Sequence, residues 1–148
     1  MYMNFWYPVC ETAELTDKPI RVRILKHDFV AFRDSEGKPA LLADTCVHRG
    51  GALSGGKCMD DGTVQCPYHG WRFTTDGVCT RIPSLGISAK IPARARVDAY
   101  PTLDKYGLVF AFLGDLPEEE RPPIMPIEEY ETDGWRATVQ TFNVNYNY

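Results

Sequence analysis

The chain has 148 residues, of which 44% are hydrophobic, and this length and composition suit one globular domain with a substantial core. Its 20 acidic and 16 basic residues give a formal net charge of −4, so the basic surface of a nucleic-acid-binding protein is not expected. The N-terminus has no basic segment followed by an apolar run, and no stretch approaches the ~20 apolar residues of a membrane span. We therefore expect a cytoplasmic protein with no nucleic-acid and no membrane partner.

Short strands separated by turns are predicted along most of the chain, and no segment has a long helical period. Alternation of polar and apolar residues, or β-branched content, predicts strands at residues 21–25, 28–32, 39–44, 71–73, 78–80, 97–100 and 107–113. A hairpin loop is expected at 34–38, and a turn near 104–107 is expected to join the strands at 97–100 and 107–113. This pattern predicts an all-β fold.

The region after the last of these strands changes in charge. Residues 115–133 contain eight acidic residues and one base, Arg121, and four prolines interrupt the same stretch. Such a composition predicts an extended surface connector, either a solvated linker or a docking strip for a basic surface. Residues 135–142 then have the β-branched content of a further strand.

Two mixed Cys/His pairs carry the candidate chemistry. Cys46-Val-His48 is followed, after seventeen residues, by Cys66-Pro-Tyr-His69. A Rieske [2Fe–2S] centre needs two thiolates and two imidazoles, because one iron takes two cysteines and the other takes two histidines. A structural zinc ion accepts the same donors, although zinc sites usually group Cys with Cys and His with His.

The residues around these pairs closely resemble the two cluster loops of the Rieske family in its oxygenase branch. The segments that carry the resemblance are Cys46-Val-His-Arg-Gly-Gly-Ala-Leu53 and Cys66-Pro-Tyr-His-Gly-Trp-Arg-Phe73. The similarity extends from Asn4-Phe-Trp-Tyr-Pro8 to Tyr106-Gly-Leu-Val-Phe-Ala-Phe-Leu-Gly114, a pattern typical of the N-terminal part of Rieske non-haem iron oxygenase alpha subunits.

The resemblance implies a Rieske-type antiparallel β-sandwich over residues 1–133, with a small inserted cluster-binding subdomain at about 45–84 and the acidic connector at 115–133. It implies that a [2Fe–2S] cluster is held by four ligands: Cys46, His48, Cys66 and His69. Residues 134–148 resemble the first strand of a catalytic domain that is otherwise missing. In the family, that domain holds a mononuclear Fe(II) with two histidines and one carboxylate.

The histidine count decides what this chain is expected to do alone. There are three histidines, and with His48 and His69 assigned to the cluster only His27 remains. A second iron site of the usual type cannot be assembled, so we expect no catalytic residue in this chain. The resemblance implies an electron-transfer domain, with an NAD(P)H-dependent reductase or a ferredoxin as donor, the catalytic domain as acceptor, and a homotrimer in the full-length protein. The acceptor site would hydroxylate or demethylate an aromatic or related small organic substrate.

The alternative is a free-standing Rieske ferredoxin that carries electrons between a reductase and a separate oxygenase. Such a carrier could end near Gly114, whereas this chain continues through the connector into a predicted strand, and this favours the oxygenase interpretation. The three other cysteines, Cys10, Cys58 and Cys79, are expected to be structural thiols.

The loops also differ from those of the respiratory Rieske branch. Gly51 and Tyr68 stand where that branch has two disulfide-forming cysteines, and Trp71 and Phe73 stand where it places hydroxyl groups near the sulfurs. Fewer hydrogen bonds to the sulfurs favour the oxidised cluster. We therefore expect a reduction potential from about −150 mV to near zero, at the lower end of the Rieske range.

Overall fold

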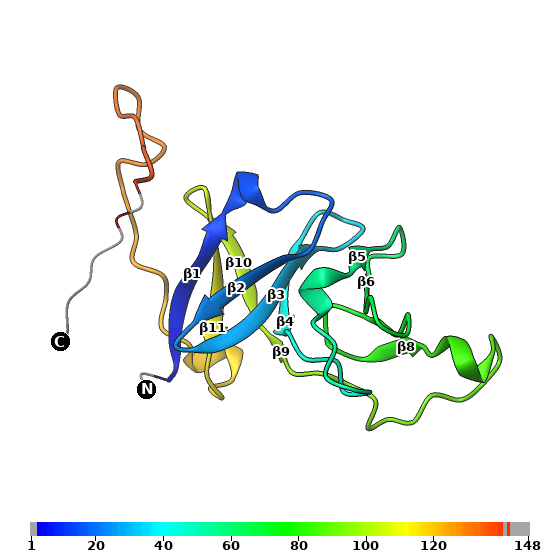
Figure 1. Cartoon of the computed structure of the whole chain (residues 1–148). Helices are drawn as coiled ribbons and strands as arrows, with labels where there is room; N and C mark the ends of the chain where they lie inside the picture. Colours follow the sequence, from blue (N-terminus) through cyan, green and yellow to red (C-terminus); the bar gives the residue numbers. More distant parts are fainter. Residues whose placement is uncertain (1–2, 141, 143–148) are drawn as a thin grey trace.

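The computed structural model of the protein describes residues 3–140 and 142, and its strands form three antiparallel sheets (Figure 1). The strands are β1 (Phe5–Glu11), β2 (Ile20–Ile24), β3 (His27–Arg33), β4 (Pro39–Ala43), β5 (Lys57–Cys58), β6 (Val64–Gln65), β7 (Arg72–Phe73), β8 (Cys79–Arg81), β9 (Ala99–Tyr100), β10 (Thr102–Lys105) and β11 (Leu108–Leu113). The helical elements of the described residues are four 3₁₀ turns: η1 (Thr12–Glu14), η2 (Leu53–Gly55), η3 (Pro83–Leu85) and η4 (Glu118–Glu120). The predicted all-β, antiparallel fold is confirmed.

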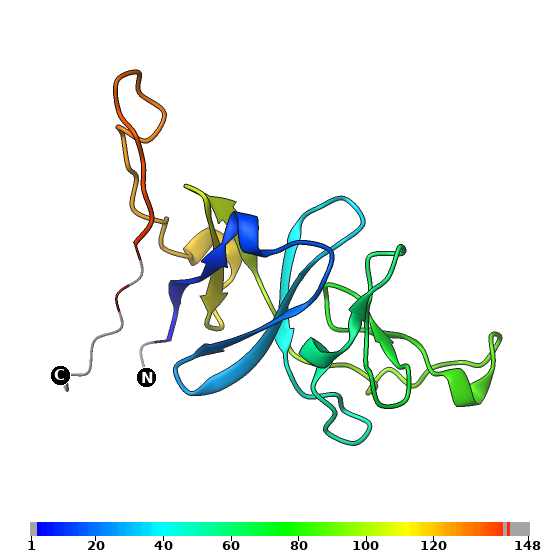
Figure 2. The same ribbon diagram turned by 45° about the horizontal axis from the view of Figure 1, so that its top comes forward.

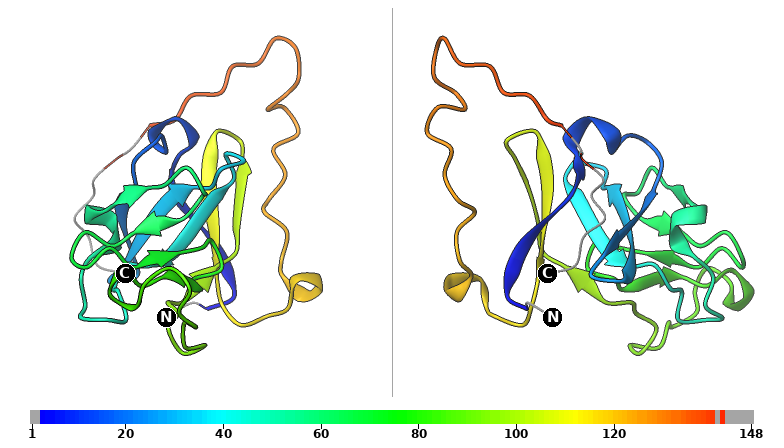
Figure 3. Two further views of the ribbon diagram at one scale, coloured as in Figure 1. Left: turned by 90° about the vertical axis from the view of Figure 1, so that its right-hand side faces the viewer. Right: turned by 60° about the vertical axis from the view of Figure 1, so that its left-hand side comes forward.

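Two of the sheets, with strand orders β1-β11-β10 and β2-β3-β4-β9, form a base domain. The third sheet, β5-β6-β7-β8, belongs to an inserted subdomain, residues 45–97, which lies between β4 and β9 in the sequence. The views in Figure 3 show the sheet β2-β3-β4-β9 as the middle of three layers, with the β1-β11-β10 sheet on one side and the inserted subdomain on the other.

The middle position explains why β3 is apolar without interruption from Phe29 to Phe32 and why β4 is apolar throughout. Phe29 and Ala31 face the core inside the base domain, whereas Val30 and Phe32 face the core of the inserted subdomain. Because successive side chains of a strand point to opposite faces, a strand buried on both faces carries a continuous apolar run. The inserted subdomain is therefore packed directly on the sheet that supports it.

The predicted connection between the last strands is wrong in one respect. The turn near 104–107 joins β11 to β10, and not to the strand predicted at 97–100. That segment forms β9, which pairs with β4 in the other sheet. Pro101 separates β9 from β10, and Tyr106 and Gly107 both have positive φ, as a two-residue hairpin turn requires. The turn residues were visible in the sequence, but the short strand β10 that precedes them was missed.

The acidic connector runs back along the base domain rather than standing free. The Trp6 indole N–H donates a hydrogen bond of 2.8 Å to the Pro122 carbonyl, and the Ile127 N–H donates one of 2.9 Å to the Tyr106 hydroxyl. The Tyr106 ring also contacts the Tyr130 ring, with centroids 4.9 Å apart. Figure 2 shows the connector and the inserted subdomain at opposite ends of the base domain.

The strand predicted at 135–142 is not present at residues 135–140, which form no ladder with another described segment. Residues 141 and 143–148 lie outside the described part of the chain. A strand at the edge of a domain needs a neighbouring strand to pair with. The assignment of residues 134–148 to a catalytic domain therefore remains a prediction.

Candidate metal centre

The first cysteine begins a compact loop immediately after β4. The Cys46 N–H donates to the Gly51 carbonyl at 2.9 Å, and the Gly50 N–H donates to the Cys46 carbonyl at 2.8 Å. Gly50 has φ +70°, a backbone conformation that a residue with a Cβ rarely adopts. The glycine therefore allows the chain to turn back within six residues and to place His48 at the outside of the loop.

The second cysteine begins a loop with the same backbone hydrogen bonds. The Cys66 N–H donates to the Trp71 carbonyl at 2.8 Å, and the Gly70 N–H donates to the Cys66 carbonyl at 3.1 Å. Gly70 has φ +71°, almost the value of Gly50 in the first loop. The two motifs differ in spacing by one residue, yet they form matching turns with His69 at the outside of the second.

A buried carboxylate holds the first loop to the body of the subdomain. The Asp44 side chain is 5% exposed, and it accepts hydrogen bonds from the Ser54 N–H at 2.7 Å and from the Ser54 hydroxyl at 2.6 Å. Asp44 precedes the loop and Ser54 follows it, so these two hydrogen bonds hold the ends of the loop together. They position Cys46 indirectly, without a bond between Cys46 and Asp44. Neither residue was identified from the sequence, because the pairing depends on where η2 folds back onto the end of β4.

The two thiols lie together in the core of the subdomain. Cys46 and Cys66 are each 2% exposed, and their side chains contact each other. Burial raises the pKa of Cys46 to about 11, while the N–H groups of His48 and Arg49 act in the opposite direction by donating to the sulfur. With this raised pKa, the Cys46 thiol stays protonated at neutral pH until a metal replaces the proton.

The two imidazoles lie together at the surface. The ring centroids of His48 and His69 are 4.6 Å apart, and both side chains are exposed. The Trp71 indole stacks on the His48 ring with centroids 4.6 Å apart, and the centroids of the Tyr68 and His69 rings are 3.9 Å apart. Loss of solvation among these rings, followed by the positive charges of His69 and Arg49, lowers the pKa of His48. The neutral imidazole, which is the form that binds a metal, is thereby favoured.

The four candidate ligands are therefore arranged as a buried thiol pair and an exposed imidazole pair. Within residues 3–140 and 142, no three His, Cys, Asp or Glu side chains converge closely enough to hold one metal ion. A tetrahedral zinc site needs four donors around one ion, whereas a Rieske centre needs two donors at each of two irons. The pairing of the two thiols in the core and of the two imidazoles at the surface is the arrangement that a Rieske centre needs.

The remaining histidine and cysteines lie elsewhere. His27 begins β3 in the base domain and is exposed. Cys10 lies in β1, and Cys58 and Cys79 lie in β5 and β8 of the inserted subdomain. All five cysteines of the chain are among the described residues, and all are free thiols. Burial raises the pKa values of Cys10, Cys58 and Cys79, as expected for unreactive structural thiols.

A family model described as the Rieske [2Fe-2S] domain matches residues 5–101, which include both loops and most of the base domain. The chain belongs to the Rieske [2Fe–2S] domain family. Its fold is accordingly the Rieske antiparallel β-sandwich, and its cofactor is the Rieske-type [2Fe–2S] cluster. The buried thiol pair and exposed imidazole pair are compatible with that cofactor.

Several proteins similar to this Rieske domain are described as oxygenases. It is 42% identical, over 83% of its length, to the phenoxybenzoate dioxygenase subunit alpha of Ectopseudomonas oleovorans, and 36% identical, over 83% of its length, to chlorophyllide a oxygenase of Arabidopsis thaliana. It spans only 29% and 22% of the lengths of these two relatives. The crystal structure of apo dicamba monooxygenase superposes with a TM-score of 0.72 at 33% identity, covering 81% of this chain and 37% of that one.

The chain is therefore similar to the Rieske domains of these oxygenases, which are the proteins that the sequence of its two loops resembles. No helix among residues 3–140 and 142 is long and apolar enough to cross a membrane. Several similar proteins, among them chlorophyllide a oxygenase and protein TIC 55 of Arabidopsis thaliana, are chloroplast proteins, so the cytoplasmic location stays a prediction.

Proposed function

We propose that Cys46, His48, Cys66 and His69 hold the [2Fe–2S] cluster of this Rieske domain, which serves as the electron-transfer domain of a Rieske non-haem iron oxygenase. The observation that carries the proposal is the pairing of the two loops, with two thiols in the core and two imidazoles at the adjacent surface. When bound, the cluster supplies reversible one-electron chemistry. The residues of the chain determine where that electron enters and leaves.

The thiol pair provides the enclosed side of the site. Because Cys46 and Cys66 are almost fully buried, their sulfurs are shielded from water and from oxidants. The N–H groups of His48 and Arg49 point at the Cys46 sulfur and favour its anionic form. Loading of the site is expected to release the thiol protons, so that assembly of the centre becomes more favourable as the pH rises.

The imidazole pair provides the open side. His48 and His69 are exposed, and the Trp71 ring fixes the plane of His48. A partner that reaches these rings is within electron-transfer distance of the centre, while the thiol side stays protected. An NAD(P)H-dependent reductase or a ferredoxin is proposed as the donor. The acceptor is a mononuclear Fe(II) held by two histidines and a carboxylate of a catalytic domain.

The substrate and assembly follow from the relatives and are proposals for the whole protein. Phenoxybenzoate and dicamba, named for two similar oxygenases, are small aromatic molecules. We propose hydroxylation or demethylation of an aromatic or related small organic substrate in the catalytic domain, which residues 134–148 would begin. A homotrimer in the full-length protein and a cytoplasmic location are proposed with it.

Anaerobic reconstitution with iron and sulfide tests the ligand assignment. The wild-type chain is expected to take up two irons and two sulfides per chain and to show visible charge-transfer absorption. The variants Cys46→Ser and His69→Ala are expected to lose both the iron uptake and the absorption. Cys79→Ser is the matched control, because Cys79 is a buried thiol of the same subdomain outside the two loops, and it is expected to retain the full complement. Full iron content in Cys46→Ser, or uptake of zinc in preference to iron by the wild type, would contradict the proposal.

A further inference from the structure

A single charged residue is buried where the inserted subdomain meets the sheet that supports it. Asp44, at the end of β4, is 5% exposed, and among residues 3–140 and 142 it is the one Asp, Glu, Lys or Arg that is buried. Burial of a charge costs free energy of desolvation unless hydrogen bonds or an opposite charge compensate it. The fold therefore keeps this carboxylate in its interior in spite of a cost that a neutral residue would avoid.

The partners of Asp44 are hydrogen-bond donors without a charge. Its two carboxylate oxygens accept from the Ser54 N–H at 2.7 Å and from the Ser54 hydroxyl at 2.6 Å. It forms no ion pair with any residue that the structure describes. The pKa of Arg21 is raised first by its hydrogen bond to Asp28, at 2.7 Å, and only last by the charge of Asp44. The negative charge of Asp44 is thus held in place but is not neutralised.

This charge lies behind the first of the candidate ligands. Asp44 precedes Cys46 by two residues, so the Cα atoms of the two residues are within about 8 Å of each other. Cys46 is 2% exposed, and it belongs to the same apolar cluster as Leu53, the fully buried residue that precedes Ser54. Charges act on each other more strongly in such an interior than in water, and dissolved salt screens them less.

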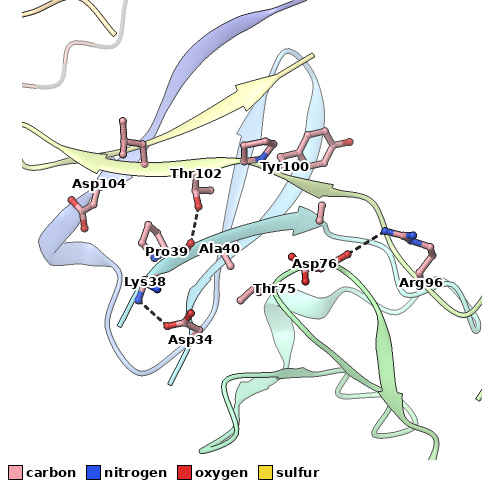
Figure 4. A pocket seen from close by; sticks show the side chains of 13 residues that line it. Asp34, Lys38, Pro39, Ala40, Thr75, Asp76, Arg96, Tyr100, Thr102 and Asp104 are labelled. Atoms are coloured by element: carbon pink, nitrogen blue, oxygen red, sulfur yellow. Dashed lines mark hydrogen bonds between the residues drawn. The ribbon is translucent and has the colours of Figure 1, made fainter. Parts of the chain in front are cut away.

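The three acids of the inserted subdomain itself are in a different environment. Asp60, Asp61 and Asp76 are all exposed, and Asp61 is ion-paired with Arg72 at 3.3 Å. Asp76 lines a cleft of about 710 Å³ between the subdomain and the base domain, where its backbone carbonyl, and not its carboxylate, accepts a hydrogen bond from Arg96 (Figure 4). Water screens these three charges, so Asp44 is the acid from which an effect on the centre is expected.

We propose that the buried charge of Asp44 lowers the reduction potential of the [2Fe–2S] centre, while its hydrogen bonds to Ser54 hold the Cys46 loop. The inference rests on the proposed function, since it concerns the same site. Reduction adds one electron, and so one unit of negative charge, to the centre. A fixed carboxylate behind Cys46 repels the added charge, so the oxidised state is favoured. Asp44 is a positioning residue in this account, because it acts on the centre through Cys46 and its loop.

The variant Asp44→Asn separates the charge from the geometry. An amide of the same shape can accept from the Ser54 N–H and donate to the Ser54 hydroxyl oxygen, so both hydrogen bonds remain while the charge is lost. A redox titration of the cluster-loaded chain, followed by visible absorbance, measures the potential. We expect the equilibrium constant for reduction to rise about threefold in Asp44→Asn, a positive shift of about 30 mV for a one-electron couple. The matched control Asp76→Asn removes an exposed charge from the same region and should leave the potential unchanged.

A second variant and a change of salt test the two parts of the proposal independently. Ser54→Ala keeps the charge of Asp44 but loses one of its two hydrogen bonds, so the cluster absorbance should bleach about threefold faster in excess chelator. Its potential should equal that of wild type or lie below it. Asp44→Asn should bleach at close to the wild-type rate. Because the charge is buried, the threefold difference between Asp44→Asn and wild type should persist from about 20 to 500 mM salt.

The outcomes distinguish this inference from the proposed function. A wild-type chain that loads no cluster overturns the proposed function and the inference with it. A loaded Asp44→Asn with the wild-type potential overturns the inference alone, as does a shift of the same size in Asp76→Asn. A rise in potential in Ser54→Ala would assign the effect to loop geometry, and a difference that vanishes at high salt would assign it to a screened charge. Failure of Asp44→Asn to load a cluster that wild type loads would show that the charge serves assembly, and each of these results contradicts the proposal.

Discussion

The Trp71 indole lies flat on the His48 imidazole, with ring centroids 4.6 Å apart and planes only 6° from parallel. The two residues belong to different loops, so this contact joins the second loop to the histidine of the first. It also orients the imidazole before any metal is bound. A preorganised ligand loses less conformational freedom on binding than a mobile one.

Removal of the Trp71 indole is therefore expected to weaken binding of the cluster. Trp71→Ala should lower the stability of the loaded site by about 1 kcal/mol, so that the cluster absorbance bleaches about fivefold faster in excess chelator. Trp71→Phe, which retains an aromatic face, should bleach at an intermediate rate. The control Trp135→Ala removes an exposed indole that lies beyond the connector and should leave the rate unchanged. Equal rates for Trp71→Ala and wild type would show that the stack has no such role.

A second pair of positions also links the loops. A Cβ built on Gly51 would lie 3.3 Å from the Tyr68 Cβ, close to the spacing of about 3.8 Å found in disulfides. These are the two positions at which the respiratory branch is expected to have cysteines. The double variant Gly51→Cys/Tyr68→Cys, loaded and then oxidised, should form a disulfide and gain about 3 kcal/mol in its free energy of unfolding. Urea unfolding with and without reductant, together with mass spectrometry of free thiols, measures both effects.

The single variant Gly51→Cys is the control for that experiment. Its side chain would meet the Cys66 sulfur at 3.2 Å without a partner for a disulfide, so it should be slightly less stable than wild type. A double variant that remains fully reduced after oxidation would show that the two loops are not held at this separation.

A close backbone contact joins Gly77 to Val97, the last residue of the inserted subdomain before β9, and the Val97 N–H donates to the Gly77 carbonyl at 2.9 Å. Gly77 and Gly37 have similar positive φ values, +76° and +80°, but a Cβ at Gly77 would lie 2.0 Å from the Val97 carbonyl oxygen, whereas a Cβ at Gly37 meets nothing within 4 Å. Gly77→Ala should cost more than about 3 kcal/mol in unfolding free energy, and Gly37→Ala about 1 kcal/mol. Chemical denaturation of the two variants measures the difference, and equal losses would contradict the predicted clash.

Arg33 connects three segments of the base domain that are distant in sequence. Its guanidinium donates to the carbonyls of Leu15 at 2.8 Å, Gly37 at 2.7 Å and Thr12 at 3.0 Å, and to the Asp104 carboxylate at 3.3 Å. Arg33→Lys keeps the charge but has no planar fork, so most of these bonds are lost, and we expect about 2 kcal/mol less stability in urea unfolding. The control Arg23→Lys, at a largely exposed side chain, should change stability by less than about 0.5 kcal/mol. A similar small change in both variants would contradict this role.

The sequence predicted those parts of the fold that depend on local pattern. The alternation at β2, the apolar runs of β3 and β4, and the hairpin between them are found where the residues indicated. The two cysteine–histidine loops also appear where the motifs predicted them, because their glycines and close spacing allow few backbone conformations.

What depended on contacts distant in the sequence was not predicted. The split between β9 and β10 follows from which sheet each strand joins, and Pro101 alone does not reveal it. Asp44 and Arg33 look like ordinary surface charges in the sequence, because their hydrogen-bond partners come from segments brought together only in the folded protein. The connector was expected to lie on the surface, but its anchoring by Trp6 could not be read from composition.

Nitrogen hyperfine spectroscopy tests the central claim most directly. The reduced, cluster-loaded chain is prepared with ¹⁵N-labelled histidine, and its electron spin is examined for coupling to the ligand nitrogens. We predict two strongly coupled histidine nitrogens, one of which disappears in His48→Cys and the other in His69→Cys, while His27→Ala leaves both in place. A reduced iron–sulfur signal without histidine coupling, or a labelled chain that binds zinc and gives no signal, would contradict the account.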